Sequence, residues 1–210
     1  MVHILLILFI ITLIYFSIAN RLMTYVTILM VQGLIICAAA LLSLHQMNFV
    51  NLASILLETL IVKAILMPYF IRRVILANNI TREAEPSVPN YVSLLFCTGV
   101  VICSYLISQM VTAPNLNKMF FVAALAGIFC GLFFITTRRK VITHVICYVI
   151  VENGAFILSL AIGNEMPVLV NLGVVLDVLV SVFLLVIFIN KVGDVTNEGD
   201  VTGLNQLHDN

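Results

Sequence analysis

The chain has 210 residues, of which 62% are hydrophobic and 10% are charged, and its basic and acidic residues cancel to a formal net charge of zero. Soluble domains carry about 25% charged residues, so this composition indicates an integral membrane protein with no room for a separate soluble catalytic domain. The neutral balance also excludes a nucleic-acid-binding protein, because such a protein needs excess positive charge to neutralise phosphates.

The apolar segments predict an all-α integral membrane protein with about seven transmembrane helices, since about 20 apolar residues cross the hydrocarbon core. The first apolar run follows Met1-Val2-His3 without a cationic n-region or a convincing cleavage site, so it is interpreted as a span and not as a cleaved signal. In chain order, the predicted spans are approximately 2–19, 23–44, 50–76, 90–111, 117–136, 141–163 and 167–191.

Basic residues between the spans predict the orientation of the chain. Alternate loops lie on opposite sides of a membrane, and with seven spans one side receives only Lys118. The other side receives Arg21, Arg72, Arg73, Arg82, Arg138, Arg139, Lys140 and Lys191. The positive-inside rule places the second group in the cytoplasm, so the N-terminus is expected outside and the C-terminus in the cytoplasm.

Three acidic residues, Glu58, Glu152 and Asp177, interrupt the predicted spans. A charge at bilayer depth costs about 2.5–3.5 kcal/mol on insertion scales, and such residues usually face a bundle interior or an ion path. Glu152 and Asp177 lie near the middle of adjacent spans, and two carboxylates at one depth are not both comfortably ionised. The pair therefore predicts a proton carrier. The alternative is a single protonated acid that hydrogen-bonds a neighbouring backbone group or Asn.

Lys63 follows Glu58 by five residues, which in an α-helix separates their directions by roughly 140°. Lys63 is therefore expected to meet an acid of another helix or another subunit, either in proton exchange or in a purely structural ion pair. Pro68 is expected to kink the span. His144 lies two turns before Glu152 on roughly the same face. It would take up protons from the cytoplasm, or it would be an ordinary interfacial histidine.

An internal repeat relates the two ends of the chain. Val50-Asn51-Leu52 recurs 120 residues later as Val170-Asn171-Leu172, and the same offset relates Gln32 to Glu152. Because equivalent spans of the two copies lie four spans apart, the copies have the same orientation and form a parallel repeat. Gln32 cannot titrate, so it is interpreted, with Asn153, as a polar lining or as a simple helix–helix contact.

The repeat and the loops predict four regions. These are a first three-helix repeat, a loop with a connector helix, a second three-helix repeat and a polar cytoplasmic tail, at 1–76, 77–116, 117–192 and 193–210. The five cysteines lie in apolar segments without a C-x-x-C pair, so no metal site and no catalytic residue is predicted in this chain.

The motifs of the second half resemble the hydrogenase-4 component E family over nearly the whole chain. The resemblance is carried by Arg138, Cys147-Tyr148, Glu152-Asn153-Gly154, Leu172-Gly173 and Asp177, by the Lys63 to Pro68 element, and by the Asp200 to Leu204 tail. This family is a membrane subunit of group 4 membrane-bound NiFe hydrogenases and formate hydrogenlyase-type complexes. It is similar to the three-helix K-type subunit of respiratory complex I and of multisubunit cation/proton antiporters. The resemblance implies that the two repeats are K-type. Relatives carry acids on two successive helices, which Glu152 and Asp177 match, whereas Gln32 with Glu58 lacks one acid.

The resemblance implies a non-catalytic, multi-pass subunit of a prokaryotic cytoplasmic membrane. It would couple electron transfer in a peripheral hydrogenase arm to proton translocation through Glu152, Asp177, Glu58, Lys63 and His144. Partner subunits, not this chain, would hold the NiFe centre and the iron–sulfur clusters. The expected partners are antiporter-like large membrane subunits, a quinone-site-type membrane anchor subunit, the peripheral arm and the lipid bilayer. The alternatives are a structural connector without transport and a subunit of a cation/proton antiporter that has no redox partner.

Overall fold

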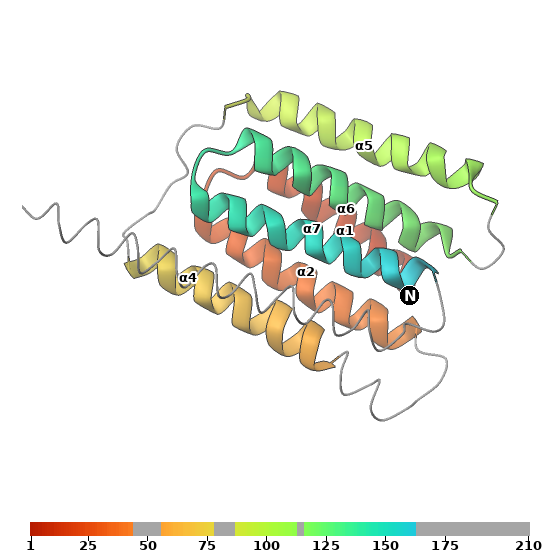
Figure 1. The fold of residues 1–210 in the computed structure, drawn as a ribbon, viewed down its shortest axis with the longest axis horizontal. Coiled ribbons are helices and arrows are strands. Elements are labelled where there is room, and N and C mark those ends of the chain that lie inside the picture. The colour runs from red at the N-terminus through yellow and green to blue at the C-terminus, as the bar shows by residue number, and fades with distance from the viewer. Residues whose placement is uncertain (44–55, 78–86, 113–115, 163–210) are drawn as a thin grey trace, which may run out of the picture.

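The computed structural model describes residues 1–43, 56–77, 87–112 and 116–162, and its helices lie side by side as a bundle (Figure 1). In chain order the helices are α1 Val2–Ile18, α2 Leu22–Ser43, η1 Leu57–Leu66, α4 Met67–Ala77, α5 Asn90–Met110, α6 Lys118–Thr137 and α7 Val141–Ile162. The predicted seventh span, 167–191, and the predicted tail, 193–210, lie outside the described residues.

Four of the described helices are long and apolar enough to cross a membrane. They are Leu22–Ser43, Asn90–Met110, Lys118–Thr137 and Ile142–Ile162. The shorter α1 is also apolar, and η1 continues directly into α4. The described helices follow the first six predicted spans in order, so the prediction of a multi-span helical membrane protein is confirmed for this part of the chain. The parallel repeat and the four predicted regions stay predictions.

The helices α1, α2, α6 and α7 form the centre of the bundle, with α5 along one edge and α4 along the other (Figure 1). The helix α7 packs along α6 and also touches α2, while η1 and α4 pack against α2. The core between them is apolar and includes the buried rings of Phe9, Phe16, Phe120 and Phe134. This arrangement places α2, η1 and α7, the helices that carry the predicted polar residues, next to one another.

Glycines bring α6 and α7 into backbone contact. A Cβ added to Gly154 would lie 2.7 Å from the backbone nitrogen of Ile128, and one added to Gly127 would lie 3.1 Å from the Cα of Gly154. Gly127 and Gly131 are four residues apart on α6, the small-xxx-small spacing of membrane helices that pack closely. Because lipid gives no hydrophobic drive for helix association, close contacts of this kind hold the two helices together.

Within the described part of the third predicted span, Leu57–Leu66 form a π-helix, η1, so the prediction of regular α-helical geometry is wrong there. In a π-helix each backbone hydrogen bond spans five residues. Backbone positions 58 and 63 therefore lie on nearly the same side of η1, and they are not separated by roughly 140° around the helix axis. The wider turns end at Leu66, two residues before Pro68, and the kink predicted at this proline stays a prediction. The side chain of Glu58 lies outside the described residues.

Three turns of the chain meet at one end of the bundle. The Asn90 Nδ2 atom donates to Asn20 Oδ1 at 3.2 Å, and the Ser87 backbone N–H donates to the carbonyl oxygen of Thr137 at 3.0 Å. The start of α6, with Lys118, lies at the opposite end (Figure 1). The described turns with Arg21 and Arg138 therefore share an end, as the loop pattern predicts. Which side of the membrane this end faces stays a prediction.

Arg138 is buried at that end, although the sequence treats it only as a basic residue between two spans. It is 3% exposed, and its guanidinium carbon lies 5.5 Å from the ring centre of Tyr25 and 5.9 Å from that of Phe16. The two rings stack on each other with centroids 4.2 Å apart. A guanidinium over aromatic faces is attracted by the ring quadrupoles, so Arg138 joins the α6–α7 turn to the α1–α2 hairpin.

Candidate functional site

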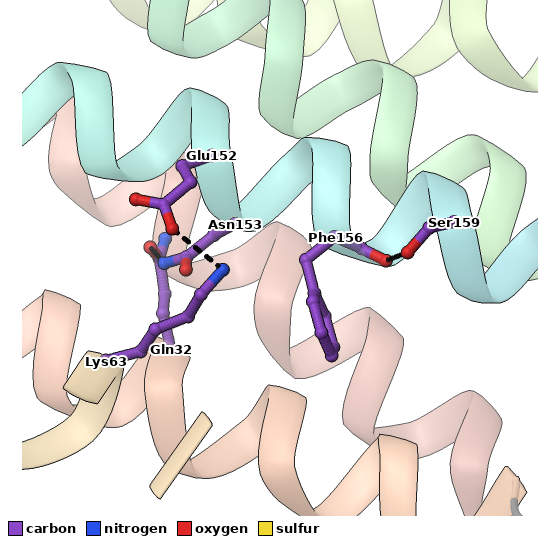
Figure 2. A network of polar contacts seen from close by, with 6 residues as sticks. All are labelled: Gln32, Lys63, Glu152, Asn153, Phe156 and Ser159. Carbon is purple, nitrogen blue, oxygen red and sulfur yellow. Dashed lines mark hydrogen bonds and ion pairs between the residues drawn. The ribbon is translucent and has the colours of Figure 1, made fainter. Parts of the chain in front are cut away.

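The centre of the site is a buried ion pair between η1 and α7. The Lys63 Nζ atom lies 3.3 Å from Glu152 Oε1, and the two side chains are 1% and 4% exposed (Figure 2). This confirms that Lys63 meets an acid of another helix. Removing two charges from water costs several kcal/mol per ion, and their mutual attraction offsets this cost only when the geometry is close. Burying this pair therefore costs free energy, and this cost marks the pair as a candidate functional site.

The packing of α7 explains why Glu152 faces η1. Gly154 lies against α6, where no side chain larger than hydrogen fits without a shift. Glu152 precedes it by two residues, which is about 200° around an α-helix. When the glycine faces α6, the carboxylate is therefore turned to the opposite side, toward η1. The Glu-Asn-Gly run thus combines a packing residue with a carboxylate on the opposite face and an amide about 100° to the side.

An aromatic ring completes the surroundings of the lysine. The Lys63 Nζ atom lies 4.8 Å from the ring centre of Phe156, one turn beyond Glu152 on α7. The negative face of an aromatic ring attracts a cation, and the attraction grows when water is excluded. Ser159 is drawn in the same view (Figure 2), but its hydroxyl donates to the carbonyl oxygen of Phe156 at 2.6 Å. That serine is satisfied by its own helix.

A chain of neutral polar groups leads away from the ion pair across the bundle. The Asn153 Nδ2 atom donates to Gln32 Oε1 at 3.3 Å, and Gln32 Nε2 donates to the Thr12 hydroxyl at 3.0 Å. The Thr12 hydroxyl in turn donates to the carbonyl oxygen of Phe9 at 2.6 Å. Side chains from α7, α2 and α1 are thereby linked. Gln32, which the sequence interprets as polar lining or as a simple helix–helix contact, binds Asn153 directly and so links α2 to α7 (Figure 2).

His144 lies on α7 between the turn at residue 140 and Glu152. Its Nδ1 atom lies 2.8 Å from the carbonyl oxygen of Lys140, so this nitrogen carries the proton in that contact. The ring is half-buried. It stands eight residues before Glu152, or about 12 Å along the helix axis. A proton role for His144 stays a prediction.

Two predicted site residues are not placed. Asp177 lies outside the described residues, and for Glu58 only the backbone position in η1 is described. Among the described residues, no three His, Cys, Asp or Glu side chains gather as metal ligands would. The described site consists of one acid, one base, two amides and a hydroxyl.

Sequence reasoning missed Thr12 and Phe156. A threonine within a helix usually hydrogen-bonds a carbonyl of its own preceding turn, as Thr12 also does. The sequence therefore does not indicate the second contact of Thr12, which is with Gln32. Phe156 follows Glu152 by four residues, the spacing at which helical side chains share a face. That spacing was the available signal, but one aromatic residue in an apolar span is not specific.

The arrangement places an acid and a base in contact away from water. A lysine and a carboxylate in a water-poor interior interact much more strongly than they would in water. The carboxylate accepts a proton to become neutral, and this leaves the lysine charge uncompensated. A second charge that approaches the pair therefore changes how readily the carboxylate takes up a proton.

These observations define a class, a multi-span helical membrane protein with a buried acid–base pair between its helices. The chain is 27% identical over 181 residues to the uncharacterised protein Rv0085 of Mycobacterium tuberculosis, which covers 85% of this chain and 82% of that protein. It is 25% identical over 157 residues to hydrogenase-4 component E of Escherichia coli, which covers 74% of this chain and 71% of that protein.

Hydrogenase-4 component E of Shigella flexneri is similar to the same extent. No family model and no solved structure matches the chain. The chain is thus distantly related to a hydrogenase-4 membrane component. This relation agrees in part with the resemblance seen in the sequence motifs.

Proposed function

We propose that the chain is a non-catalytic membrane subunit of a hydrogenase-type redox complex. It couples electron transfer in a peripheral arm to proton translocation. The observation that carries the proposal is the Lys63–Glu152 pair, buried at 3.3 Å between two apolar helices. The distant relation to hydrogenase-4 component E supports the redox partner, since that protein's name describes a component of a hydrogenase.

The coupling is electrostatic. A change of charge or hydration in a neighbouring subunit alters the balance between the ammonium of Lys63 and the carboxylate of Glu152. Because the interior screens charge poorly, even a modest displacement of one partner shifts the proton occupancy of the other. Glu152 takes up a proton when Lys63 is drawn away and releases it when the pair closes. A conformational change that moves Lys63 relative to Glu152 therefore drives the uptake or release of a proton at Glu152.

Further residues extend the pair into a path. Asp177 is the second proton carrier, Glu58 modulates the charge near Lys63, and His144 takes up protons at the end of the bundle that carries the basic turns. That end faces the cytoplasm of a prokaryote in this proposal. The adjoining subunits are antiporter-like large membrane subunits, a quinone-site-type anchor and the peripheral arm, whose subunits hold the NiFe centre and the iron–sulfur clusters.

The test uses the native complex in sealed membrane vesicles. Glu152→Gln and Asp177→Asn keep the size of each side chain and remove its charge. In those complexes that still assemble and transfer electrons, we expect the membrane potential generated per electron to fall. Lys63→Gln is expected to act in the same direction, and Lys118→Gln, at an exposed lysine at the start of α6, is its matched control.

The competing function is a structural connector whose acids only fix helix contacts. If the Glu152→Gln complex assembles and generates the normal potential at the normal electron-transfer rate, the connector explains the pair and the coupling proposal is wrong. If the purified complex transports cations and carries no redox subunit, the chain belongs to an antiporter instead.

A further inference from the structure

The side-chain hydrogen bonds that connect Asn153 to Thr12 all have the same donor-to-acceptor direction. Every hydrogen bond in it is donated away from the ion pair, from Asn153 to Gln32, from Gln32 to Thr12 and from Thr12 to the carbonyl oxygen of Phe9. The direction is fixed at the far end. A backbone carbonyl accepts and never donates, so the Thr12 hydroxyl has to give its proton to Phe9.

The donor role of Thr12 in turn fixes the orientation of the Gln32 amide and then that of the Asn153 amide. With its proton committed to Phe9, the Thr12 hydroxyl offers only lone pairs to Gln32 and must receive the amide nitrogen. The oxygen of Gln32 is then left to face Asn153 and accepts its nitrogen. The nitrogen of Asn153 is thereby held at Gln32. The oxygen of the same planar amide points elsewhere.

The oxygen of Asn153 is buried and has no hydrogen-bond partner among the described residues. It belongs to the residue directly after Glu152, and Figure 2 shows this side chain beside Glu152 and Lys63, with its nitrogen on the Gln32 side. Leaving a buried carbonyl oxygen without a hydrogen-bond partner is unfavourable. This cost is relieved when a neighbouring group supplies a proton donor.

We propose that Thr12 and Gln32 are positioning residues that hold Asn153 with its oxygen, and not its nitrogen, toward the Lys63–Glu152 pair. The Lys63 ammonium can donate whether or not Glu152 is protonated. An acceptor turned to Glu152 accepts a hydrogen from its protonated carboxyl and gives nothing to its bare carboxylate, so it favours the protonated form of that acid. The amides carry no proton themselves. They set how tightly the pair holds one. This inference rests on the proposed function, since it concerns the proton affinity of the same pair.

The inference predicts the effect of a substitution on a different helix. Thr12→Val keeps the shape of the side chain and removes the hydroxyl, so the amides lose their fixed direction and Asn153 is free to turn its nitrogen to Glu152. An N–H that faces the carboxylate favours the ionised form. We expect the proton affinity of Glu152 to fall about tenfold, the size of one hydrogen bond to a charged group. Thr12→Ser keeps the hydroxyl and should behave as the unmodified protein.

The experiment is infrared difference spectroscopy of the full chain in lipid vesicles as a function of pH. The protonated carboxyl band of Glu152 is identified by its loss in Glu152→Gln. Thr27→Val is the matched control, because the Thr27 hydroxyl on α2 is exposed and donates only to the carbonyl oxygen of Met23 at 3.0 Å. The inference is overturned if Thr12→Val titrates as the unmodified protein does. It is also overturned if Thr12→Ser shifts as much as Thr12→Val, since the effect would then come from packing.

A second readout separates this inference from the proposed function. The amide carbonyl bands of Asn153 and Gln32, assigned by isotope labelling, report the direction of the chain without any titration. Thr12→Val must move both bands, and Thr12→Ser must leave them in place. If Glu152 shows no titration while the bands move as stated, the proposed proton role fails and the directed chain stands. If the bands do not move, the directed chain fails whatever Glu152 does.

Discussion

The substitution Gly33→Ala tests the contact that holds η1, and with it Lys63, against α2. A Cβ at position 33 would lie 2.8 Å from the Cα of Ala64 and 2.9 Å from its backbone nitrogen, whereas ordinary contact begins at 3.4 Å. The clash is with backbone, which cannot rotate away. The two helices must therefore separate by about 0.6 Å, the difference between 3.4 Å and 2.8 Å.

The cost follows from two opposing terms. Forcing an extra methyl group into a packed contact costs about 1–3 kcal/mol. Alanine is the better helix former by up to about 1 kcal/mol, and this gain offsets part of the cost. Gly99→Ala isolates the gain, because a Cβ at Gly99 meets nothing within 4 Å. We expect Gly33→Ala to be less stable than Gly99→Ala by about 1–3 kcal/mol, the overpacking term alone.

The measurement is the free energy of unfolding of the full chain in mixed lipid–detergent micelles, with both variants under the same conditions. Comparing the two alanines removes the helix propensity and leaves the contact. Equal stabilities for Gly33→Ala and Gly99→Ala would refute the backbone contact between α2 and η1.

Two further substitution experiments test the polar groups of the bundle. Lys63→Met and Glu152→Gln are each expected to destabilise the chain by about 3–5 kcal/mol, since each leaves a buried charge uncompensated. The double variant should lose much less than the sum of the two, and additive losses in a double-mutant cycle would show that the groups do not interact. Arg138→Lys is expected to lose about 1 kcal/mol of unfolding free energy, because an ammonium cannot stack flat on the rings of Phe16 and Tyr25. Arg139→Lys is the control, because the Nε atom of Arg139 donates to the exposed Ser87 hydroxyl at 3.1 Å. This variant should lose almost no unfolding free energy. Equal losses in the two variants would contradict the stacking of Arg138.

The sequence predicted the bundle well because span length and apolar content are dictated by the bilayer. It also predicted that Lys63 would need an acid from another helix, since a buried charge requires a partner. It did not single out Glu152 as that acid, because no one-dimensional pattern tells how adjacent helices are rotated about their axes. The rotation of α7 depends on the close backbone contact between Gly154 and α6, and the sequence does not show which surface of α6 fits against this glycine.

Other features were beyond one-dimensional reasoning for different physical reasons. The π-helix of η1 has the same apolar composition as an α-helix, so its periodicity is hidden in a uniformly apolar run. Arg138 was treated as a surface anchor because the positive-inside rule counts charges by side and takes no account of burial. Gln32 and Asn153 were expected to make polar contacts, but amides pair with many groups, and their pairing with each other depended on the neighbouring positions of α2 and α7.

The burial of Arg138 has a consequence for the order in which the protein is made. Phe16 and Tyr25 leave the ribosome more than a hundred residues before the guanidinium that packs on them. The α1–α2 hairpin is therefore synthesised well before the residue that covers its aromatic rings. The guanidinium can pack on those rings only after α6 and the turn that follows it have been made.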